Sequence, residues 1–204
     1  MLRIIDYGSG NLRSVQKALE QQGAAAEITA DPDRVAESER LVLPGVGAFA
    51  DAMRALTQRG LVDPIKRHLA ADRPFLGICM GLQLLFETGW EGGRHKGLGA
   101  IAGDVARFEL PAGYKVPHMG WNEVQWRSGS GPAAVFPGDR PPFFYFVHSY
   151  RVRPTDPGVV VAETDYGDPF CSAVQRGRLL ATQFHPEKSQ ACGMRLLRYF
   201  LDEV

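Results

Sequence analysis

The sequence contains 204 residues, of which 45% are hydrophobic and 23% are charged, so the chain can bury a core of ordinary size. Lys plus Arg and Asp plus Glu both number 23, and this zero net charge gives no sign of a surface for nucleic acid or a membrane. Three widely spaced cysteines argue for a reducing cytoplasm and against a disulfide framework, and no Cys/His cluster has the spacing of a zinc site.

We expect no targeting signal in this sequence. No apolar run approaches the ~18 residues that cross a bilayer. Residues 1–6 predict a strand rather than a signal peptide. We therefore expect a cytoplasmic protein with one domain over residues 1–204, with neither a metal nor a cofactor.

The first half of the chain alternates between predicted strands and helices. Strands are expected at residues 2–6, 25–29, 41–43 and 74–78, and helices at 12–22, after 32, at 49–58 and from 63 to about 71. Asp31 and Asp63 each precede a proline, which predicts a capped helix start. This alternation indicates a parallel sheet with helices on both faces, whose active site lies at the carboxyl ends of its strands.

Two glycine-rich loops follow predicted strands. The loop 6–11 lacks the spacing of a P-loop or a dinucleotide fingerprint, so we expect a tight turn that faces a partner rather than a phosphate cradle. In Pro44-Gly45-Val46-Gly47, two glycines beside Val46 allow the backbone to change conformation. An N–H of this loop could complete an oxyanion hole in a cysteine acyl-transfer site, and an ordinary βα turn is the alternative.

Residues 73–87 carry the strongest functional signal. Cys79 lies between Gly77 and Gly81, after an apolar strand and before an apolar segment, 82–87, that predicts a buried helix. This is a Gly-x-nucleophile-x-Gly elbow with sulfur in place of a serine oxygen. The glycines permit a strained turn, and a helix N-terminus would favour the thiolate. A buried structural cysteine is the alternative interpretation.

Gln83 is the only uncharged polar residue of the predicted helix after Cys79. Positions four apart share a helix face, so its amide would look into the same space as the sulfur. A buried amide needs partners, which a substrate could provide. Alternatively, Gln83 caps a neighbouring loop.

The second half of the chain changes character. Residues 88–99 predict a flexible glycine-rich loop that contains Glu91. Strands are then expected at residues 105–108, 122–126, 143–147, 159–162, 170–174 and 179–184, as a mainly antiparallel extension of the same sheet. The segments 117–122 and 145–150 place aromatic residues beside polar ones. His118 and His148, taken alone, would be structural histidines, and Cys171 and Cys192 would be packing residues.

The last predicted strand leads into His185-Pro186-Glu187. In an extended segment residues i and i+2 point the same way, so the carboxylate of Glu187 can reach the imidazole of His185. Such a carboxylate-held base is what a cysteine nucleophile requires. Ser189 is then expected to cap a closing helix from 190 to about 201.

The elbow Gly77-Ile78-Cys79-Met80-Gly81-Leu82-Gln83, followed by His185-Pro186-Glu187, resembles the class I, triad-type glutamine amidotransferases over the whole chain. The resemblance implies an α/β fold with three layers, a mostly parallel central sheet with helices on both faces and an antiparallel β extension. Within that family the chain looks like the glutaminase subunits of imidazole glycerol phosphate synthase. This narrower match rests on residues 6–11, 44–47, 117–122, 145–150 and 185–189, whereas residues 87–91 depart from the family's acidic, serine-rich segment.

The resemblance also implies the roles of individual residues. Cys79 would attack the side-chain amide of glutamine, His185 would pass a proton to the departing ammonia, and Glu187 would orient His185, before water hydrolyses the thioester. The oxyanion would be bound by the N–H of Met80 and by one N–H of the 45–47 segment, from Val46 or Gly47. The glutamine-binding residues would be Gly45, Gln83, Glu91, His148, Ser149 and Tyr150.

A partner is implied as well. The chain would form a heterodimer with a (β/α)8 cyclase, and ammonia would cross their interface to a phosphoribosyl-formimino carboxamide nucleotide. The products would be imidazole glycerol phosphate, for histidine biosynthesis, and aminoimidazole carboxamide ribotide. The docking face would include Asn11, Met119, Trp121, Tyr145 and Lys188.

Three other functions remain open at this point. An amidotransferase for pyridoxal, anthranilate or guanylate synthesis is the nearest, but it fits the 44–47 and 117–122 segments less well. A cysteine peptidase or esterase would explain the elbow alone. A non-catalytic binding subunit would leave Cys79, His185 and Glu187 without a purpose.

Overall fold

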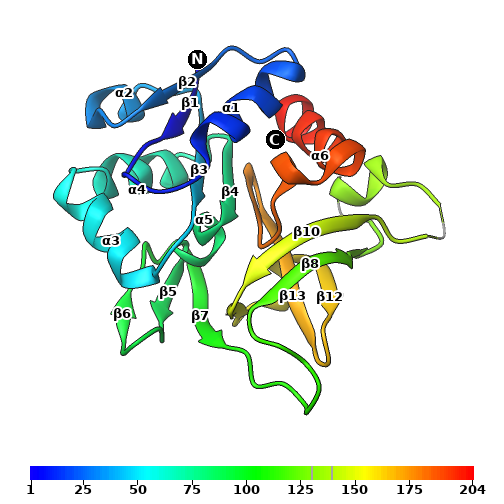
Figure 1. The fold of residues 1–204 in the computed structure, drawn as a ribbon. Helices are drawn as coiled ribbons and strands as arrows, with labels where there is room; N and C mark the ends of the chain where they lie inside the picture. The colour runs from blue at the N-terminus through cyan, green and yellow to red at the C-terminus, as the bar shows by residue number, and fades with distance from the viewer. Residues whose placement is uncertain (130, 139) are drawn as a thin grey trace.

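The computed structural model describes residues 1–129, 131–138 and 140–204. A twelve-stranded mixed sheet runs through the molecule, and a separate two-stranded sheet lies beside it (Figure 1). Five parallel strands form the first part of the large sheet, in the order β2-β1-β3-β4-β14. They are β1 (Leu2–Ile5), β2 (Ala26–Thr29), β3 (Arg40–Gly45), β4 (Phe75–Cys79) and β14 (Leu179–Thr182).

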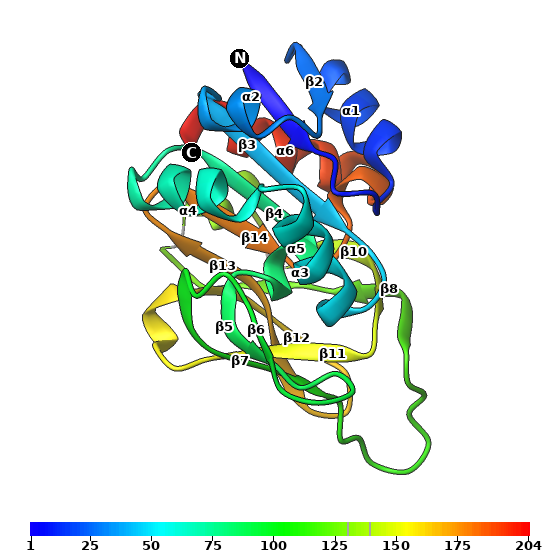
Figure 2. The same cartoon turned by 90° about the vertical axis from the view of Figure 1, so that its left-hand side faces the viewer.

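Helices cover both faces of these parallel strands. α1 (Leu12–Gln21) and α6 (Gln190–Glu203) lie on one face. α3 (Phe49–Gln58) and α4 (Val62–Ala70) lie on the other, with the short α2 (Pro32–Ala36) packed against α4 (Figure 2). In the described part of the chain, no helix combines the length and apolarity needed to cross a bilayer.

Of the two helix starts predicted at Asp31 and Asp63, the structure confirms the first and contradicts the second. The carboxylate of Asp31 accepts from the N–H of Asp33 and caps α2, as expected. Asp63 does not cap α4, because that helix begins at Val62 and Asp63 lies inside its first turn, where a negative charge favours the helix dipole.

The large sheet continues as an extension that is mainly antiparallel. β13 (Pro169–Arg176) pairs antiparallel with β14, and β11 (Tyr150–Pro154), β7 (Ile101–Arg107), β5 (Phe86–Gly89) and β6 (His95–Lys96) follow in that order. β12 (Val160–Asp165) also pairs with β13, and β9 (Gln125–Trp126) pairs with β12. The predicted fold class is therefore confirmed: a mostly parallel central sheet with helices on both faces and an antiparallel extension.

The sequence predicted that all strands of the extension would belong to the large sheet, and this prediction is wrong for two of them. β8 (His118–Glu123) and β10 (Phe143–His148) pair only with each other, antiparallel, and form the two-stranded sheet. β11 was not predicted, because its alternation of large polar and apolar residues follows directly on the aromatic run of β10. The described residues also form three 3₁₀ turns: η1 (Gly131–Val135), η2 (Pro157–Val159) and η3 (Pro186–Lys188).

The predicted helix at 82–87 is wrong. The helical segment α5 spans only Met80–Gln83, and Phe86 already belongs to β5, where it pairs with Ile101. An apolar run of this length suits a buried helix or a buried strand equally well, and the neighbouring strand β7 decides between them.

The segment 88–99 is also more ordered than predicted. β5 and β6 form an antiparallel hairpin in which Thr88 pairs with Lys96. The hairpin lies close against Phe49 of α3, because a Cβ added at Gly89 would lie 2.7 Å from the Phe49 ring. The glycines of this segment therefore serve close packing as well as turning.

Two hydrophobic clusters fill the space between the sheet and its helices. One contains Phe49, Leu56 and Ile65 from α3 and α4, and the other contains Val15 and Phe200 from α1 and α6. These side chains are almost fully buried, which fixes the helices against the sheet. The carboxyl ends of β3, β4 and β14 are thus held in one place.

Candidate active site

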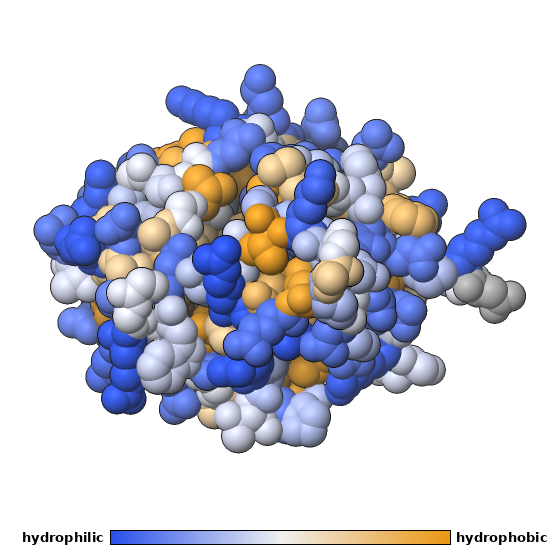
Figure 3. Space-filling model, turned by 60° about the horizontal axis from the view of Figure 1, so that its bottom comes forward, coloured by the Kyte–Doolittle hydropathy of each residue, from blue (hydrophilic) through white to orange (hydrophobic). Residues whose placement is uncertain are grey.

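The carboxyl ends of three neighbouring parallel strands meet at one edge of the sheet. Gly45 of β3 pairs with Cys79 of β4, and Ile78 pairs with Thr182 of β14. The segments that follow these strands therefore bring Val46, Met80 and His185 toward each other, as expected for a parallel sheet. Figure 3 views the molecule from the side on which these strands end, and apolar side chains gather near the middle of that face, among hydrophilic ones.

Cys79 has the strained backbone that the elbow predicts. Its φ of +56° lies in a region that residues with a side chain rarely adopt. The two glycines are required by close contacts, because a Cβ at Gly81 would lie 1.8 Å from the carbonyl oxygen of Leu43, and one at Gly77 would lie 2.9 Å from that of Gly81. The turn thus places the sulfur at the end of the strand.

His185 and Glu187 form a buried pair beside this elbow. Nδ1 of His185 lies 2.8 Å from Oε1 of Glu187, and only 3% and 1% of the two side chains are exposed. Burial disfavours the charged imidazole, but the neighbouring sulfur of Cys79 and the carboxylate of Glu187 outweigh it and raise the pKa of His185 to about 10. Nε2 of His185 has no hydrogen-bond partner among the described residues and remains available for proton transfer.

Ser189 fixes the backbone around His185. Its hydroxyl donates to the carbonyl of His185 at 2.6 Å and accepts from the N–H of Tyr145 at 3.0 Å. The N–H of His185 donates to the carbonyl of Tyr145. The prediction that Ser189 caps α6 is right in position only, because its hydroxyl ties the histidine to β10 instead of bonding the helix.

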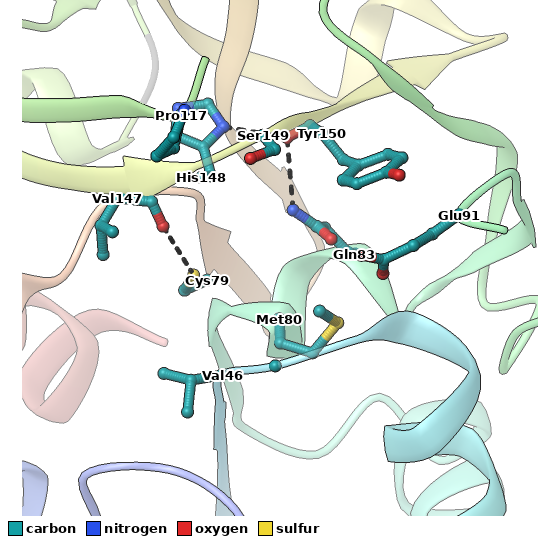
Figure 4. Close-up of a pocket in the computed structure, with 11 residues that line it drawn as sticks. Val46, Cys79, Met80, Gln83, Glu91, Pro117, Val147, His148, Ser149 and Tyr150 are labelled. Atoms are coloured by element: carbon teal, nitrogen blue, oxygen red, sulfur yellow. Dashed lines mark hydrogen bonds between the residues drawn. The ribbon is translucent and has the colours of Figure 1, made fainter.

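Cys79 opens onto a cavity of about 310 Å³ (Figure 4). Its walls come from five parts of the chain: Val46, Gly47, Cys79, Met80, Gln83, Glu91, Pro117, Val147, His148, Ser149 and Tyr150. Most of the residues that the sequence assigned to oxyanion or glutamine binding are among them. Gly45, His185 and Glu187 are not among the residues that line the cavity.

Gln83 and Glu91 both have partners within the protein. Nε2 of Gln83 donates to Oε1 of Gln183 at 3.0 Å and to the carbonyl of Tyr150 at 3.3 Å. The carboxylate of Glu91 accepts from the N–H of Phe49 at 2.7 Å, at the start of α3. Both side chains are thus held in place at the wall of the cavity.

His148 has no ring nitrogen left for a ligand. Nδ1 lies 2.9 Å from the carbonyl of Tyr150, which can only accept, so Nδ1 carries the proton. Nε2 then accepts from Nδ1 of His118 at 2.9 Å, and Nε2 of His118 accepts from the amide of Asn122. Burial lowers the pKa of His148 to about 3 and that of His118 to about 4, so both rings are neutral at pH 7.

The 45–47 segment separates two cavities. Val46 and Gly47 line the cavity at Cys79 and also a second one of about 280 Å³, which Tyr7 and Ser9 line from the other side. The carbonyl of Val46 accepts from the hydroxyl of Ser9 at 2.7 Å, and Gly47 has a φ of +98°. The segment therefore has open space on both sides and, within the part of the chain that the structure describes, one side-chain hydrogen bond that holds it.

Several of the residues predicted for docking lie side by side. Trp121 of β8 is opposite Tyr145 of β10, with ring centroids 6.2 Å apart, and Nζ of Lys188 lies 5.8 Å from the centre of the Tyr145 ring. Met119, on the same strand as Trp121, is 62% exposed. Asn11 is exposed at the start of α1, which packs against η3.

Sequence reasoning missed Gln183, which is fully buried and donates to Sγ of Cys79 at 3.7 Å. The signal was present: Gln183 is a polar residue at the end of an apolar strand, two positions before His185. Its partners are about a hundred residues away in the sequence, so only the fold identifies them. No group of three or more His, Cys, Asp or Glu side chains within the described ranges is placed to hold a metal ion.

A strained cysteine at the end of a parallel strand, next to a buried histidine–carboxylate pair, is the arrangement of a cysteine nucleophile with its base. Residues 3–204 match the sequence profile of the family described as glutamine amidotransferase class-I. A solved structure described as glutamine amidotransferase superposes with a TM-score of 0.75, over 98% of this chain and 97% of that one. PurLQS from Thermotoga maritima gives a TM-score of 0.76 over the same shares. Their identities of 22% and 17% show a shared fold alone.

Similarity in sequence extends further. Imidazole glycerol phosphate synthase subunit HisH of Rhodopirellula baltica is 58% identical over 200 residues, which are 98% of this chain and 96% of that protein. The HisH subunit of Aquifex aeolicus is 51% identical over 199 residues, which are 97% of this chain and 94% of that protein. The chain therefore belongs to the class-I glutamine amidotransferase family and, within it, to the HisH subunits of imidazole glycerol phosphate synthase.

Proposed function

We propose that this chain hydrolyses glutamine to glutamate and ammonia, as the glutaminase subunit of imidazole glycerol phosphate synthase in histidine biosynthesis. The observation that carries the proposal is the elbow cysteine beside a buried His185–Glu187 pair, at the wall of a cavity. Membership of the HisH subunits supports both the substrate and the pathway.

The first half of the reaction forms a thioester. Sγ of Cys79 attacks the side-chain carbonyl carbon of glutamine, while His185 holds the proton taken from the thiol. That proton passes to the amide nitrogen as the carbon–nitrogen bond breaks and ammonia leaves. The charge of Glu187 favours the protonated histidine on which this transfer depends, in keeping with the raised pKa of His185.

The second half of the reaction hydrolyses the thioester. His185 takes a proton from a water molecule, whose oxygen attacks the thioester carbon. The carbon–sulfur bond then breaks, glutamate leaves and Cys79 is restored. No other reactant is needed.

The cavity wall provides the groups that hold glutamine. The carboxylate of Glu91 can bind the ammonium group of the substrate. Both contacts of the Gln83 amide use its Nε2, so its oxygen can accept a hydrogen bond from the substrate. Ser149 and Tyr150 contribute backbone and polar groups beside them, and Gly45, which does not line the cavity, acts through the segment 45–47 that it begins. His148 acts through its ring edge and by fixing the Tyr150 carbonyl, since both of its nitrogens are occupied.

The oxyanion of each tetrahedral intermediate needs two N–H donors. We propose the N–H of Met80, which follows the nucleophile, and that of Val46, with Gly47 as the flexible neighbour. The tether from Ser9 to the Val46 carbonyl holds this segment in the free chain. Docking of the partner's ligand then changes the segment and completes the pair of donors.

The partner in this proposal is the (β/α)8 cyclase subunit, in a cytoplasmic heterodimer. Ammonia loses its nucleophilicity when it is protonated in solution, so a closed interface is needed for its transfer. Met119, Trp121, Tyr145, Lys188 and Asn11 form the docking face. The cyclase then makes imidazole glycerol phosphate and aminoimidazole carboxamide ribotide.

The test is glutamate release by the purified chain, alone and with the cyclase and the cyclase nucleotide ligand. We expect release from glutamine to rise at least about a hundredfold in the liganded complex, the effect of one oxyanion donor. Peptide and ester substrates should give no product. Equal rates for the isolated chain and the liganded complex would contradict the proposed activation, and cleavage of peptides or esters would contradict the proposed substrate.

A further inference from the structure

The side chain of Gln183 bridges the nucleophile and a second residue of the cavity wall. It is completely buried, and its Nε2 lies 3.7 Å from Sγ of Cys79. Its Oε1 accepts from Nε2 of Gln83 at 3.0 Å. The backbone N–H of Gln183 is fixed by the carbonyl of Ser172 on β13. A buried amide with both ends occupied in this way has a single position.

The carbonyl of Tyr150 determines how the amides of Gln83 and Gln183 are oriented. Since a carbonyl can only accept, the nitrogen of the Gln83 amide must face it, as the 3.3 Å contact requires. The other N–H of the same nitrogen meets Gln183, which must therefore accept with its oxygen. The nitrogen of Gln183 is left facing the sulfur, so this contact is an N–H donor to Sγ and not an oxygen.

Besides the imidazole of His185, which the neighbouring sulfur helps to keep protonated, few of the described residues offer the sulfur a donor. The helical segment after the elbow is a single turn, Met80–Gln83, which provides little of the charge of a full helix N-terminus. The carbonyl of Val147 lies 4.0 Å from Sγ and favours the protonated thiol, because it can only accept a hydrogen bond (Figure 4). The amide of Gln183 is thus the polar contact that favours the thiolate on this side of the sulfur.

We propose that Gln183 is a positioning residue that donates a hydrogen bond to the Cys79 thiolate and holds the amide of Gln83 toward the cavity. One buried side chain then prepares the nucleophile and a substrate-binding residue together. The inference rests on the proposed function, because it concerns the same nucleophile.

The titratable groups near Cys79 come from several elements. His185 and Glu187 follow β14, and the charge of Cys79 acts on both His185 and the buried Tyr7, which follows β1. His148, from β10, interacts with His185. A variant of Gln183 leaves all of these in place, so the comparison with wild type isolates the amide.

The test measures the rate at which iodoacetamide alkylates each cysteine at a series of pH values between 5 and 10. Peptide mass mapping identifies the alkylated cysteine in each sample. Gln183→Met keeps the length of the side chain but has no donor. In this variant we expect alkylation of Cys79 at pH 7 to be about tenfold to a hundredfold slower than in wild type, the effect of one hydrogen bond to a charged group. The pH profile should move to higher pH, which a loss of packing alone would not produce.

Two variants serve as controls. Ser172→Ala changes a fully buried neighbour on β13 whose hydroxyl has no partner among the described residues, and Cys79 should be alkylated at the wild-type rate. Gln183→Asn keeps an amide on a shorter side chain, and it should give an intermediate rate. Alkylation of the half-buried Cys192 is the internal reference in every sample.

Wild-type rates and pH profiles for Cys79 in folded Gln183→Met or Gln183→Asn protein would overturn the inference. If the Met variant does not fold, the Asn variant decides. Failure of the wild-type complex to release glutamate from glutamine would instead reject the proposed function, whatever the alkylation rates are.

Discussion

Nδ1 of His185 lies 2.8 Å from Oε1 of Glu187, and both side chains are almost completely buried. A carboxylate in this position fixes the tautomer of the imidazole and favours its protonated form. Because the second carboxylate oxygen, Oε2, has no partner among the described residues, the histidine is the main group that offsets burial of the charge. Removal of that charge should therefore change both catalysis and stability.

We expect Glu187→Gln to lower kcat for glutamine by about a hundredfold or more, because the amide no longer stabilises the charged histidine. The KM for glutamine should change little, since Glu187 does not line the cavity. Steady-state glutamate release by the complex with the cyclase measures both. A kcat close to that of wild type would show that His185 does not need the carboxylate.

The same substitution should change how stability depends on pH. The folded pKa of His185, about 10, is above its ordinary value of 6.5, so its contribution to the unfolding free energy is fully present below about pH 6.5. This contribution declines as the pH rises from there and is lost as the pH passes the folded pKa. Urea denaturation between pH 6 and pH 10 should therefore show a smaller decline for Glu187→Gln than for wild type, and parallel curves would contradict the raised pKa.

Cys79→Ser should abolish release of glutamate while the complex still uses ammonium salts. Serine removes the sulfur and keeps the shape of the elbow, so the cyclase reaction should proceed from added ammonia. Cys192→Ser, on the helix α6, should behave as wild type in both assays. Loss of activity with ammonia as well as with glutamine would assign Cys79 a structural role.

Gly81→Ala should destabilise the fold by about 3 kcal/mol, because the new carbon would lie 1.8 Å from the backbone oxygen of Leu43, so that α5 or β3 must move. Gly92→Ala is a matched control: Gly92 has a φ of +68° and open space around it, so the cost should be about 1 kcal/mol. Equal midpoints of urea denaturation for the two variants would contradict the close contact between residue 81 and the Leu43 carbonyl.

The parts of the fold that the sequence predicts well are those with local signals. The helix at 49–58 has the predicted bounds, because a flexible glycine pair precedes it and its apolar residues recur along one face. Asp31 and Pro32 start a helix where expected, for the same kind of local reason. The elbow is recognisable because Gly77 and Gly81 flank Cys79 at the spacing of a nucleophile elbow.

Long-range contacts account for what the sequence does not predict. Phe86 joins a strand because Ile101 pairs with it, and nothing within 82–87 indicates that neighbour. The direction of the Gln183 amide depends on the Tyr150 carbonyl, and the protonation of His148 depends on His118 and Asn122. In each case the deciding partner is distant in the sequence.

Ser9→Ala should raise the basal glutaminase rate of the isolated chain. The hydroxyl of Ser9 is the side-chain tether on the carbonyl of Val46, and loss of a hydrogen bond worth about 1 kcal/mol should make the rearranged segment about fivefold more populated. The rate of the liganded complex should not change, so the activation ratio should fall. An unchanged basal rate would mean that the tether does not control the 45–47 segment.

Trp121→Ala should weaken binding to the cyclase by about tenfold to a hundredfold, the effect of removing a buried aromatic residue from the centre of an interface. Trp121 is 47% exposed in the free chain and stacks edge-on against Tyr145, which also packs under Lys188. Trp90 is an equally exposed tryptophan, 48%, on the β5–β6 hairpin, so Trp90→Ala controls for loss of a surface aromatic. Titration calorimetry with the cyclase measures both affinities, and folding should be unaffected in both variants. If the two substitutions had the same effect, the docking face would lie elsewhere than on the two-stranded sheet.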